Sequence, residues 1–171
     1  MCALAQLPNL LTMEFILMNN FMQLHTSQIH TDLGYVHIHA NDEGIVSIAF
    51  AEDALEPDEN PLTKLAAVQL SEYFAQKRKH FQLPLAAKGT NFQQGVWAAL
   101  CNIEYGQTAS YLDIATNVCN PKACRAVGAA NGKNPIAIVV PCHRIIGSNG
   151  TLTGYAGGMN RKSYLLALEN N

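Results

Sequence analysis

The segment best suited to chemistry is Cys142-His-Arg, which follows an apolar run from Pro135 to Pro141. A cysteine attacks as the thiolate, which nearby cations and access to a base favour. The apolar run predicts a short buried strand that ends at Cys142, where Pro141 imposes a turn. Consecutive strand residues point to opposite faces, so this turn is needed before His143 can serve the thiol. For a Cys-His pair alone, an inert thiol is the more common case.

Two glycine-rich stretches follow the cysteine. Gly147-Ser-Asn-Gly is typical of a hairpin turn, and Gly154-Tyr-Ala-Gly-Gly is typical of a surface loop. Both lie within 16 residues of Cys142. They favour a shaped pocket around the thiol.

The second half of the chain predicts helices that position this segment. Asn91 to Leu100 has apolar residues at helical spacing, and Ser110-Tyr-Leu-Asp has the spacing of a capping box that opens a helix to about Asn117. Asn120-Pro121 predicts an N-cap with proline at the first helical position, for a helix that runs to Asn131-Gly132. Two short helices joined by a few residues outline a helix-turn-helix.

The last of these helices has one apolar stripe and one nearly bare face. The stripe consists of Ala123, Ala126, Val127 and Ala130. The other face carries Arg125 among residues with almost no side chain, which are Gly128, Ala129 and Gly132. Such a face can approach a backbone or groove closely, with Arg125 projecting from it alone. The alternative is that the small residues permit tight helix packing while Arg125 points to water.

The first half of the chain predicts a small sheet and one helix. Strands are expected from Phe21 to Phe50, because Tyr35 to His39 alternates and Ile45 to Phe50 is rich in β-branched residues. The acidic run 52–61 predicts a loop. A helix follows, because residues from Leu62 to Tyr73 recur at helical spacing, and it is expected to end in the basic cluster Lys77-Arg78-Lys79, with a connector over 81–89.

Composition narrows the classes of protein further. The 171 residues are 49% apolar and 14% charged with a net charge of −2, which excludes a disordered chain. Residues 1–84 carry four basic and ten acidic side chains, whereas residues 85–171 carry seven basic and three acidic ones. The second half, at +4, is therefore the half expected to meet an anionic partner.

Targeting and redox signals indicate an intracellular protein. No run approaches the about 18 apolar residues of a membrane span, and the start resembles no secretory signal. The five cysteines include no CxxC pair and predict reduced thiols. We expect a cytoplasmic protein, or a nuclear one in a eukaryote, without membrane contact.

The motifs Arg125-Ala-Val-Gly, Asn134-Pro-Ile and Pro141-Cys-His-Arg, in this order, resemble the O6-alkylguanine-DNA alkyltransferase family, also called methylated-DNA–protein-cysteine methyltransferases. The similarity runs from Gly89 to Glu169. It implies an α+β chain with a small N-terminal α/β domain (ribonuclease H-like) over 21–84, and a mostly helical domain with a winged helix-turn-helix over 85–171. Residues 1–20 form an extension of unclear role.

The resemblance also implies a repair activity and its residues. The protein would bind double-stranded DNA through the minor groove, flip out an O6-alkylguanine, and transfer the alkyl group irreversibly to Cys142. O4-alkylthymine is a second candidate substrate. His143 would act as base through a water, and Glu169 would orient it. Tyr111 would protonate N3 of the leaving guanine, and Asn134 would bridge the recognition helix and the active-site turn.

Further residues are implied for DNA and for the flipped base. Arg125 would fill the gap in the duplex, with DNA contacts from Tyr111, Lys122, Ala126, Gly128 and Ala129. The base pocket would be built from Asn131, Pro141, Ile145, Tyr155 and Ala156. Ala156 stands where some members have serine, which matters little if its backbone N–H contacts O6. Because the chain ends two residues after Glu169, we expect that helix to fray and hold His143 loosely. No cofactor is implied, and the protein is expected to be a monomer, with cooperative binding along DNA as an alternative.

Three other interpretations compete. Cys2 and several N-terminal histidines could suggest zinc, but no four ligands have suitable spacing, so we expect no metal and histidines on a polar face: His25, His30, His37 and His39. A lesion-binding relative without catalysis would lack the cysteine, which is present here. A cysteine hydrolase would need an oxyanion hole, of which the sequence carries no sign.

Overall fold

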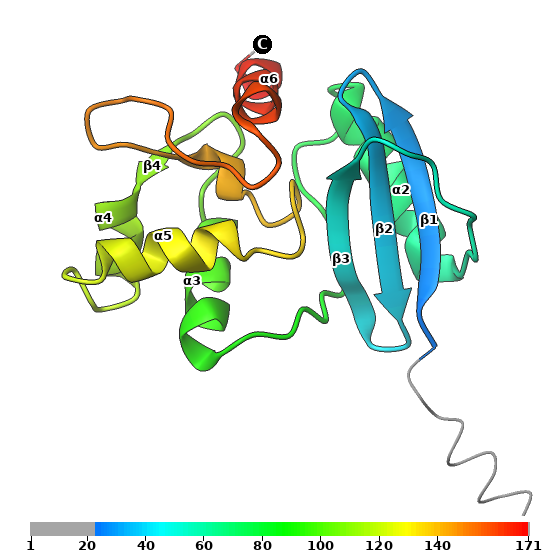
Figure 1. Cartoon of the computed structure of the whole chain (residues 1–171), viewed down its shortest axis with the longest axis horizontal. Coiled ribbons are helices and arrows are strands. Elements are labelled where there is room, and N and C mark those ends of the chain that lie inside the picture. Colours follow the sequence, from blue (N-terminus) through cyan, green and yellow to red (C-terminus); the bar gives the residue numbers. More distant parts are fainter. Residues whose placement is uncertain (1–22, 171) are drawn as a thin grey trace, which may run out of the picture.

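The computed structural model describes residues 23–170, so the predicted extension over 1–20 and Cys2 lie outside the described residues. The chain is α+β. A three-stranded antiparallel sheet in the order β1-β2-β3 (His25–Thr31, Gly34–Asn41, Gly44–Ala51) is covered on one face by helix α2 (Pro61–Phe74), as Figure 1 shows. The alternation of the strands buries Val36, Ile38 and Ala40 beneath α2 and the rest of the core. The predicted strands and helix are confirmed.

Helix α2 begins as the sequence requires but ends earlier than predicted. Asn60 accepts from the backbone of Thr63 while Thr63 accepts from the backbone of Asn60, which closes a capping box ahead of Pro61. The helix ends at Phe74, because Gln76 takes a left-handed φ of 58°. The cluster at 77–79 therefore lies beyond the helix, and its predicted place in the last turn is wrong.

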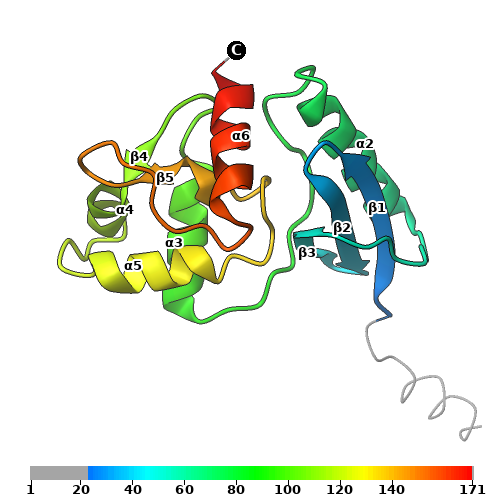
Figure 2. The same cartoon turned by 45° about the horizontal axis from the view of Figure 1, so that its top comes forward.

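The second unit consists mainly of helices. They are α3 (Asn91–Cys101), α4 (Tyr111–Asn117), α5 (Cys124–Gly132) and α6 (Met159–Glu169), with the short parallel pair β4 (Ala109–Ser110) and β5 (Ile145–Ile146) and the 3-10 helix η1 (Cys142–Arg144). Helix α5 packs against both α3 and α4, and α6 stands above them (Figure 2). The predicted capping box is confirmed, because Ser110 and Asp113 cap each other at the start of α4.

Helix α5 begins later than predicted. Cys119 takes a φ of 56°, and the backbone N–H of Asn120 bonds to Ala115 O at 2.8 Å. Asn120 therefore closes the end of α4 instead of capping α5. The N-cap of α5 is Ala123, without a side-chain cap.

Neither the strand nor the hairpin predicted around the cysteine forms. Residues 135–141 make successive turns, with Ile138 at a φ of 72° and a single bridge from Ile136 to Ile48. Around 147–151 the chain makes a turn, but β5 pairs with β4 in parallel, so no antiparallel partner follows. Instead of a strand ladder, backbone hydrogen bonds to Ile48 of β3 satisfy the polar groups of Pro135 and Ala137.

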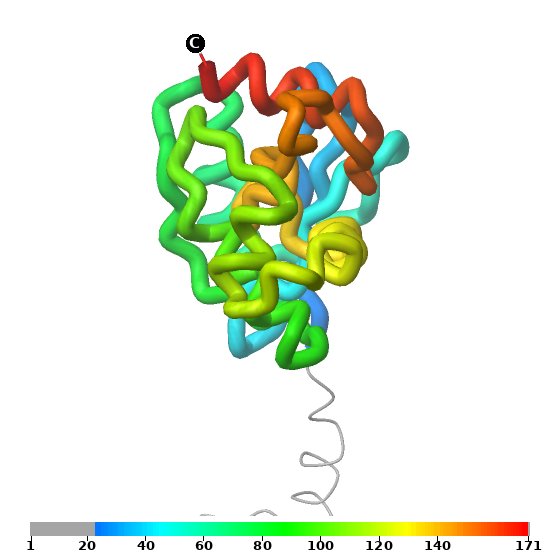
Figure 3. Tube along the Cα trace, turned by 90° about the vertical axis from the view of Figure 1, so that its left-hand side faces the viewer, coloured from blue at the N-terminus to red at the C-terminus, as the bar shows by residue number. Residues whose placement is uncertain are grey.

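The two units share one buried core. The backbone of Ile48 in β3 accepts from Ala137 N and donates to Pro135 O, both at 2.9 Å. Strand β3 is thus hydrogen-bonded to the turns that lead to the cysteine. Figure 3 views the chain from the helical side, with the sheet behind and α5 seen end-on. Across residues 23–170, no helix is long and apolar enough to cross a membrane.

Candidate active site

Cys142 is held at the first residue of η1, directly after Pro141. Its side chain is buried, and Asn134 Nδ2 lies 3.1 Å from its Sγ and 2.8 Å from Val140 O. Burial raises the pKa of the thiol, whereas the hydrogen bond from Asn134 and the charge of Lys162 act in the opposite direction. Cys142 is thus a thiol at rest that has a donor ready for the thiolate.

His143 and Glu169 form a buried pair. His143 Nε2 lies 2.7 Å from Glu169 Oε1, and neither side chain is exposed. Burial lowers the pKa of His143, against the opposing effect of the carboxylate. Nε2–H donates to the carboxylate, so Nδ1 is the free acceptor, and it is buried without a protein partner. This nitrogen can take a proton from a nearby group.

The Glu169 carboxylate accepts hydrogen bonds from three further residues. Arg144 donates through Nε to Oε2 at 2.8 Å and through Nη2 to Oε1 at 3.0 Å, Gly106 N donates to Oε2 at 3.2 Å, and Tyr73 OH donates to Oε1 at 2.7 Å. Burial alone would raise the pKa of Glu169, but these donors and His143 outweigh it and hold the pKa at about 2. The loose hold expected near the chain end is therefore wrong.

A cavity of about 220 Å³ opens beside Cys142. Tyr155 OH and Asn131 Oδ1 are buried at this cavity without a protein hydrogen bond, and Ala156 also lines it. Its far wall comes from the sheet unit, through residues 47–50 of β3. A ligand in this cavity would meet two unpaired polar atoms and the thiol together.

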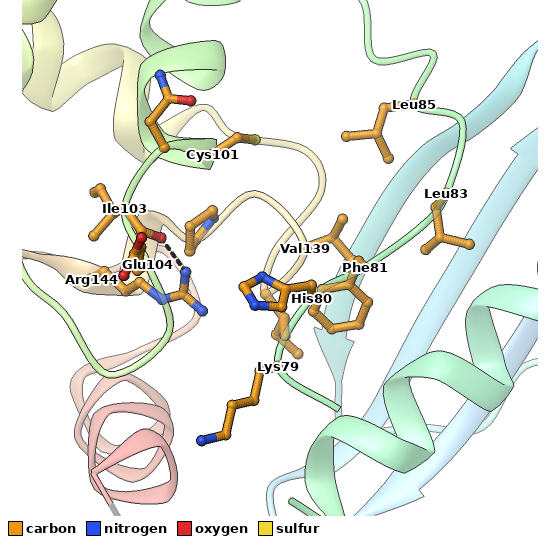
Figure 4. A pocket seen from close by; sticks show the side chains of 13 residues that line it. Lys79, His80, Phe81, Leu83, Leu85, Cys101, Ile103, Glu104, Val139 and Arg144 are labelled. Carbon is orange, nitrogen blue, oxygen red and sulfur yellow. Dashed lines mark hydrogen bonds between the residues drawn. The ribbon is translucent and has the colours of Figure 1, made fainter. Parts of the chain in front are cut away.

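Pro141 and Ile145 do not line this cavity. Ile145 is fully buried in the core, and Pro141 lines a separate cavity of about 380 Å³ behind the active-site turn. Figure 4 shows this second cavity, bordered by Lys79, His80 and Arg144, with the hydrogen bond from Arg144 Nη1 to Ile103 O (2.5 Å) at its edge. The placement of these two residues in the base pocket is corrected, because Ile145 packs in the core and Pro141 borders the separate cavity.

Tyr111 opens α4 and lies between α5 and the loop that follows the cysteine. Its hydroxyl accepts from Thr153 Oγ1 at 3.1 Å, and a Cβ added at Gly128 would lie 3.5 Å from its ring. Gly128 thus leaves the ring room above α5. Tyr111 does not border the cavity beside Cys142.

Helix α5 presents the face expected to meet DNA to solvent. Arg125, Ala126 and Ala129 are exposed, as is Lys122 ahead of the helix. Val127 and Ala130 are buried on the opposite side. Ala126 is therefore not part of the buried stripe. Among the described residues, Tyr111 of α4 covers Gly128 on the small-residue face, whereas Arg125, Ala129 and Gly132 stay exposed, which favours groove binding over tight packing.

The sequence predicted no role in the site for three buried residues, which are Lys162, Arg144 and Tyr73. Lys162 is fully buried and donates to Ile145 O and Thr153 O, which ties the loop after Cys142 to α6. Its spacing of seven from Glu169 places both on one helix face and could have revealed it. Arg144 adjoins His143 in the sequence. Tyr73 carries no such signal, because its partner lies 96 residues away.

The histidines expected on a polar face are distributed along β1 and β2. His37 Nε2 contacts Asp53 O at 2.8 Å, and His25 lies 3.3 Å from Asp58. Burial lowers the pKa of His39, and His37 contributes to this effect. Within residues 23–170 no three metal-ligating side chains converge. The absence of zinc in the whole protein stays a prediction.

A helix-turn-helix with an open small-residue face, next to a buried thiol served by a histidine and a carboxylate, defines a DNA-binding protein with a nucleophilic cysteine. Comparison with known proteins agrees. Two family models of 6-O-methylguanine DNA methyltransferase match this chain. The model of the ribonuclease-like domain matches residues 24–87, and the model of the DNA-binding domain matches residues 91–171. The chain belongs to the methylated-DNA–protein-cysteine methyltransferase family.

Individual relatives support the assignment. The methylated-DNA–protein-cysteine methyltransferase of Methanosarcina barkeri is 57% identical over 106 residues, which cover 62% of this chain and 67% of the relative. The methyltransferase of Mycobacterium tuberculosis is 44% identical over 154 residues, which cover 86% of this chain and 93% of the relative. The crystal structure of the M. tuberculosis O6-methylguanine methyltransferase superposes with a TM-score of 0.79 at 42% identity, covering 86% and 93%. The M. tuberculosis OGT in complex with DNA superposes with a TM-score of 0.79 at 43% identity, covering 85% of this chain and 92% of that chain.

Proposed function

We propose that this protein repairs DNA by direct reversal, transferring the alkyl group of O6-alkylguanine to Cys142. The observation that carries the proposal is the buried Cys142 thiol at the small cavity, with His143 paired to Glu169 at 2.7 Å. The family membership supports the same activity.

The bonds balance without a cofactor. A new bond forms between Cys142 Sγ and the alkyl carbon, while the bond from that carbon to guanine O6 breaks. The thiol proton passes to His143, which retains it as an imidazolium stabilised by Glu169. A proton from the Tyr111 hydroxyl goes to N3, so that guanine leaves neutral, and Tyr111 regains a proton from solvent. Because Tyr111 does not border the resting cavity, this step requires the flipped base and Tyr111 to come together when DNA binds. A thioether is not reversed by thiol exchange, so each molecule reacts once.

Binding to DNA is assigned to α5. Its exposed face carries Arg125 among alanines and glycines, which suits close approach to a minor groove and insertion of one side chain. Flipping is required because an alkyl group on O6 is inaccessible in the stack. The +4 charge of residues 85–171 supports phosphate contacts. A monomer in the cytoplasm stays a prediction.

The test is a mass measurement on the protein after reaction with a duplex that carries O6-methylguanine. We expect one methyl group on the peptide that contains Cys142, once per molecule. Cys142→Ala should abolish transfer and keep DNA binding, whereas Cys101→Ala, which replaces an exposed thiol, should react normally. Repeated turnover, or repaired DNA beside an unmodified peptide, would contradict the proposal. Bulkier alkyl groups and O4-methylthymine then define the substrate range.

A further inference from the structure

Tyr73 reaches from the sheet unit into the active site. It lies on α2 with no exposed surface, and its hydroxyl donates to Glu169 Oε1 at 2.7 Å. The same oxygen accepts from His143 Nε2 at 2.7 Å. A side chain of the N-terminal unit and the histidine beside the nucleophile thus share one carboxylate oxygen.

We propose that Tyr73 is a positioning residue for alkyl transfer, which fixes the Glu169 carboxylate and sets the basicity of His143 from the N-terminal unit. This inference rests on the proposed function. It assigns that unit a direct part in the chemistry, beyond covering the core.

The direction of the hydrogen bond follows from the charges. Burial raises the pKa of Tyr73, and the neighbouring carboxylate raises it further, so the phenol keeps its proton and donates. Each donor on Glu169 draws charge from the carboxylate and weakens its attraction for a proton on His143. Removal of the Tyr73 hydroxyl should therefore strengthen the His143–Glu169 bond and raise the pKa of His143.

Several other groups surround the pair, and Tyr73→Phe removes none of them. Arg144 holds the carboxylate from η1, Lys162 faces the pair from α6, and the Cys142 thiol adjoins His143. The Tyr105 ring packs edge-on to the Tyr73 ring, with 6.1 Å between the ring centroids. Lys79 Nζ lies over the Tyr105 ring, 5.2 Å from its centroid. Phe74 and Phe81 pack on the Tyr73 ring at 5.5 Å, so phenylalanine should keep this packing.

The experiment compares the single-turnover rate of methyl transfer against pH for wild type, Tyr73→Phe and Tyr105→Phe. Tyr105 is the matched control, because its hydroxyl donates to Leu168 O and not to Glu169. The acid limb of the profile reports the apparent pKa of the coupled Cys142–His143 pair. We expect this limb to move upward by about half a pH unit in Tyr73→Phe, with the rate at its former midpoint falling about two- to threefold.

A second measurement follows the ring itself. Nitrogen NMR of ¹⁵N-histidine protein should show the His143 titration moved upward in Tyr73→Phe and unchanged in Tyr105→Phe. Coincident profiles and titrations for the two variants would overturn the role of Tyr73 and leave the repair function standing. Failure of the wild type to take up a methyl group would instead overturn the repair function.

Discussion

Asn134 Nδ2 lies 3.1 Å from Cys142 Sγ and 2.8 Å from Val140 O, so one amide contacts both the nucleophile and the turn that presents it. Its Oδ1 accepts from Ile136 N at 3.0 Å, which fixes the orientation of the amide. Its backbone N–H donates to Asn131 O of α5 at 3.2 Å, so Asn134 links the helix to the active-site turn and in addition contacts the thiol. The donor is in place before the thiolate forms, which reduces the reorganisation needed during reaction.

Asn134→Ala should raise the pKa of Cys142, because the thiolate loses its side-chain donor. A hydrogen bond to a charged group contributes about 1.5–3 kcal/mol, so we expect methyl transfer to slow by about 10- to 100-fold. Single-turnover kinetics against pH measure both effects. Asn102→Ala, at an exposed helix end, is the control. An unchanged profile for Asn134→Ala would show that its amide does not act on the sulfur.

Arg125→Ala should impair reaction on duplex DNA and spare the free base. The guanidinium is exposed and has no partner among residues 23–170 that a substitution would disturb. We expect transfer from a duplex to slow by about tenfold or more, since loss of the inserted side chain removes about 1–3 kcal/mol from flipping. Transfer from free O6-benzylguanine should stay within about twofold.

Lys133→Ala is the matched control for Arg125→Ala, because it removes one exposed charge at the other end of α5. At equal salt it should weaken duplex binding slightly and leave flipping intact. Equal losses on the duplex and the free base in Arg125→Ala would exclude the intercalating role.

Lys162→Met should destabilise the protein and loosen the loop after Cys142. The substitution leaves Ile145 O and Thr153 O without the ammonium donor. One buried acceptor without its donor costs about 1–3 kcal/mol, so for the two acceptors we expect the free energy of unfolding to fall by about 2–6 kcal/mol. Urea unfolding measures this, with the exposed Lys133→Met as control. Equal stabilities would mean that other donors replace the ammonium.

Acid should destabilise the protein through Glu169. Its pKa is about 2 in the folded protein against 4.5 for the unperturbed group. Because the folded pKa is depressed, the stabilisation is fully present above about pH 4.5 and is lost as the pH falls towards 2. The difference corresponds to about 3 kcal/mol. Urea unfolding between pH 5 and pH 2.5 should show a shallower decline for Glu169→Gln than for wild type.

Glu104→Gln, an exposed carboxyl on the neighbouring turn, should keep the wild-type decline. A Glu169→Gln protein that loses stability with acid as steeply as wild type would show that Glu169 does not carry this linkage. The comparison between variants separates the contribution of Glu169 from those of the other carboxylates.

The sequence by itself determined where two helices begin and which cysteine is the candidate nucleophile. Capping boxes at Asn60 and Ser110 act between residues three apart, so the spacing was enough to predict where two helices begin. The order of the motifs, through the family resemblance that they carry, likewise singled out Cys142 and His143 as candidates. The sequence-based prediction failed where long-range backbone hydrogen bonds determine the structure. Ile48 forms backbone hydrogen bonds with Pro135 and Ala137, so the apolar run forms turns in place of a strand.

Only the tertiary structure decided how the buried charges are balanced. Glu169 sits two residues from the chain end, yet donors from Tyr73, Gly106 and Arg144 converge on its carboxylate from three separate parts of the chain. A buried carboxylate must collect such donors because it has lost its water. Their identity depends on how the sheet unit docks against the helical unit, and no periodicity within one segment encodes that.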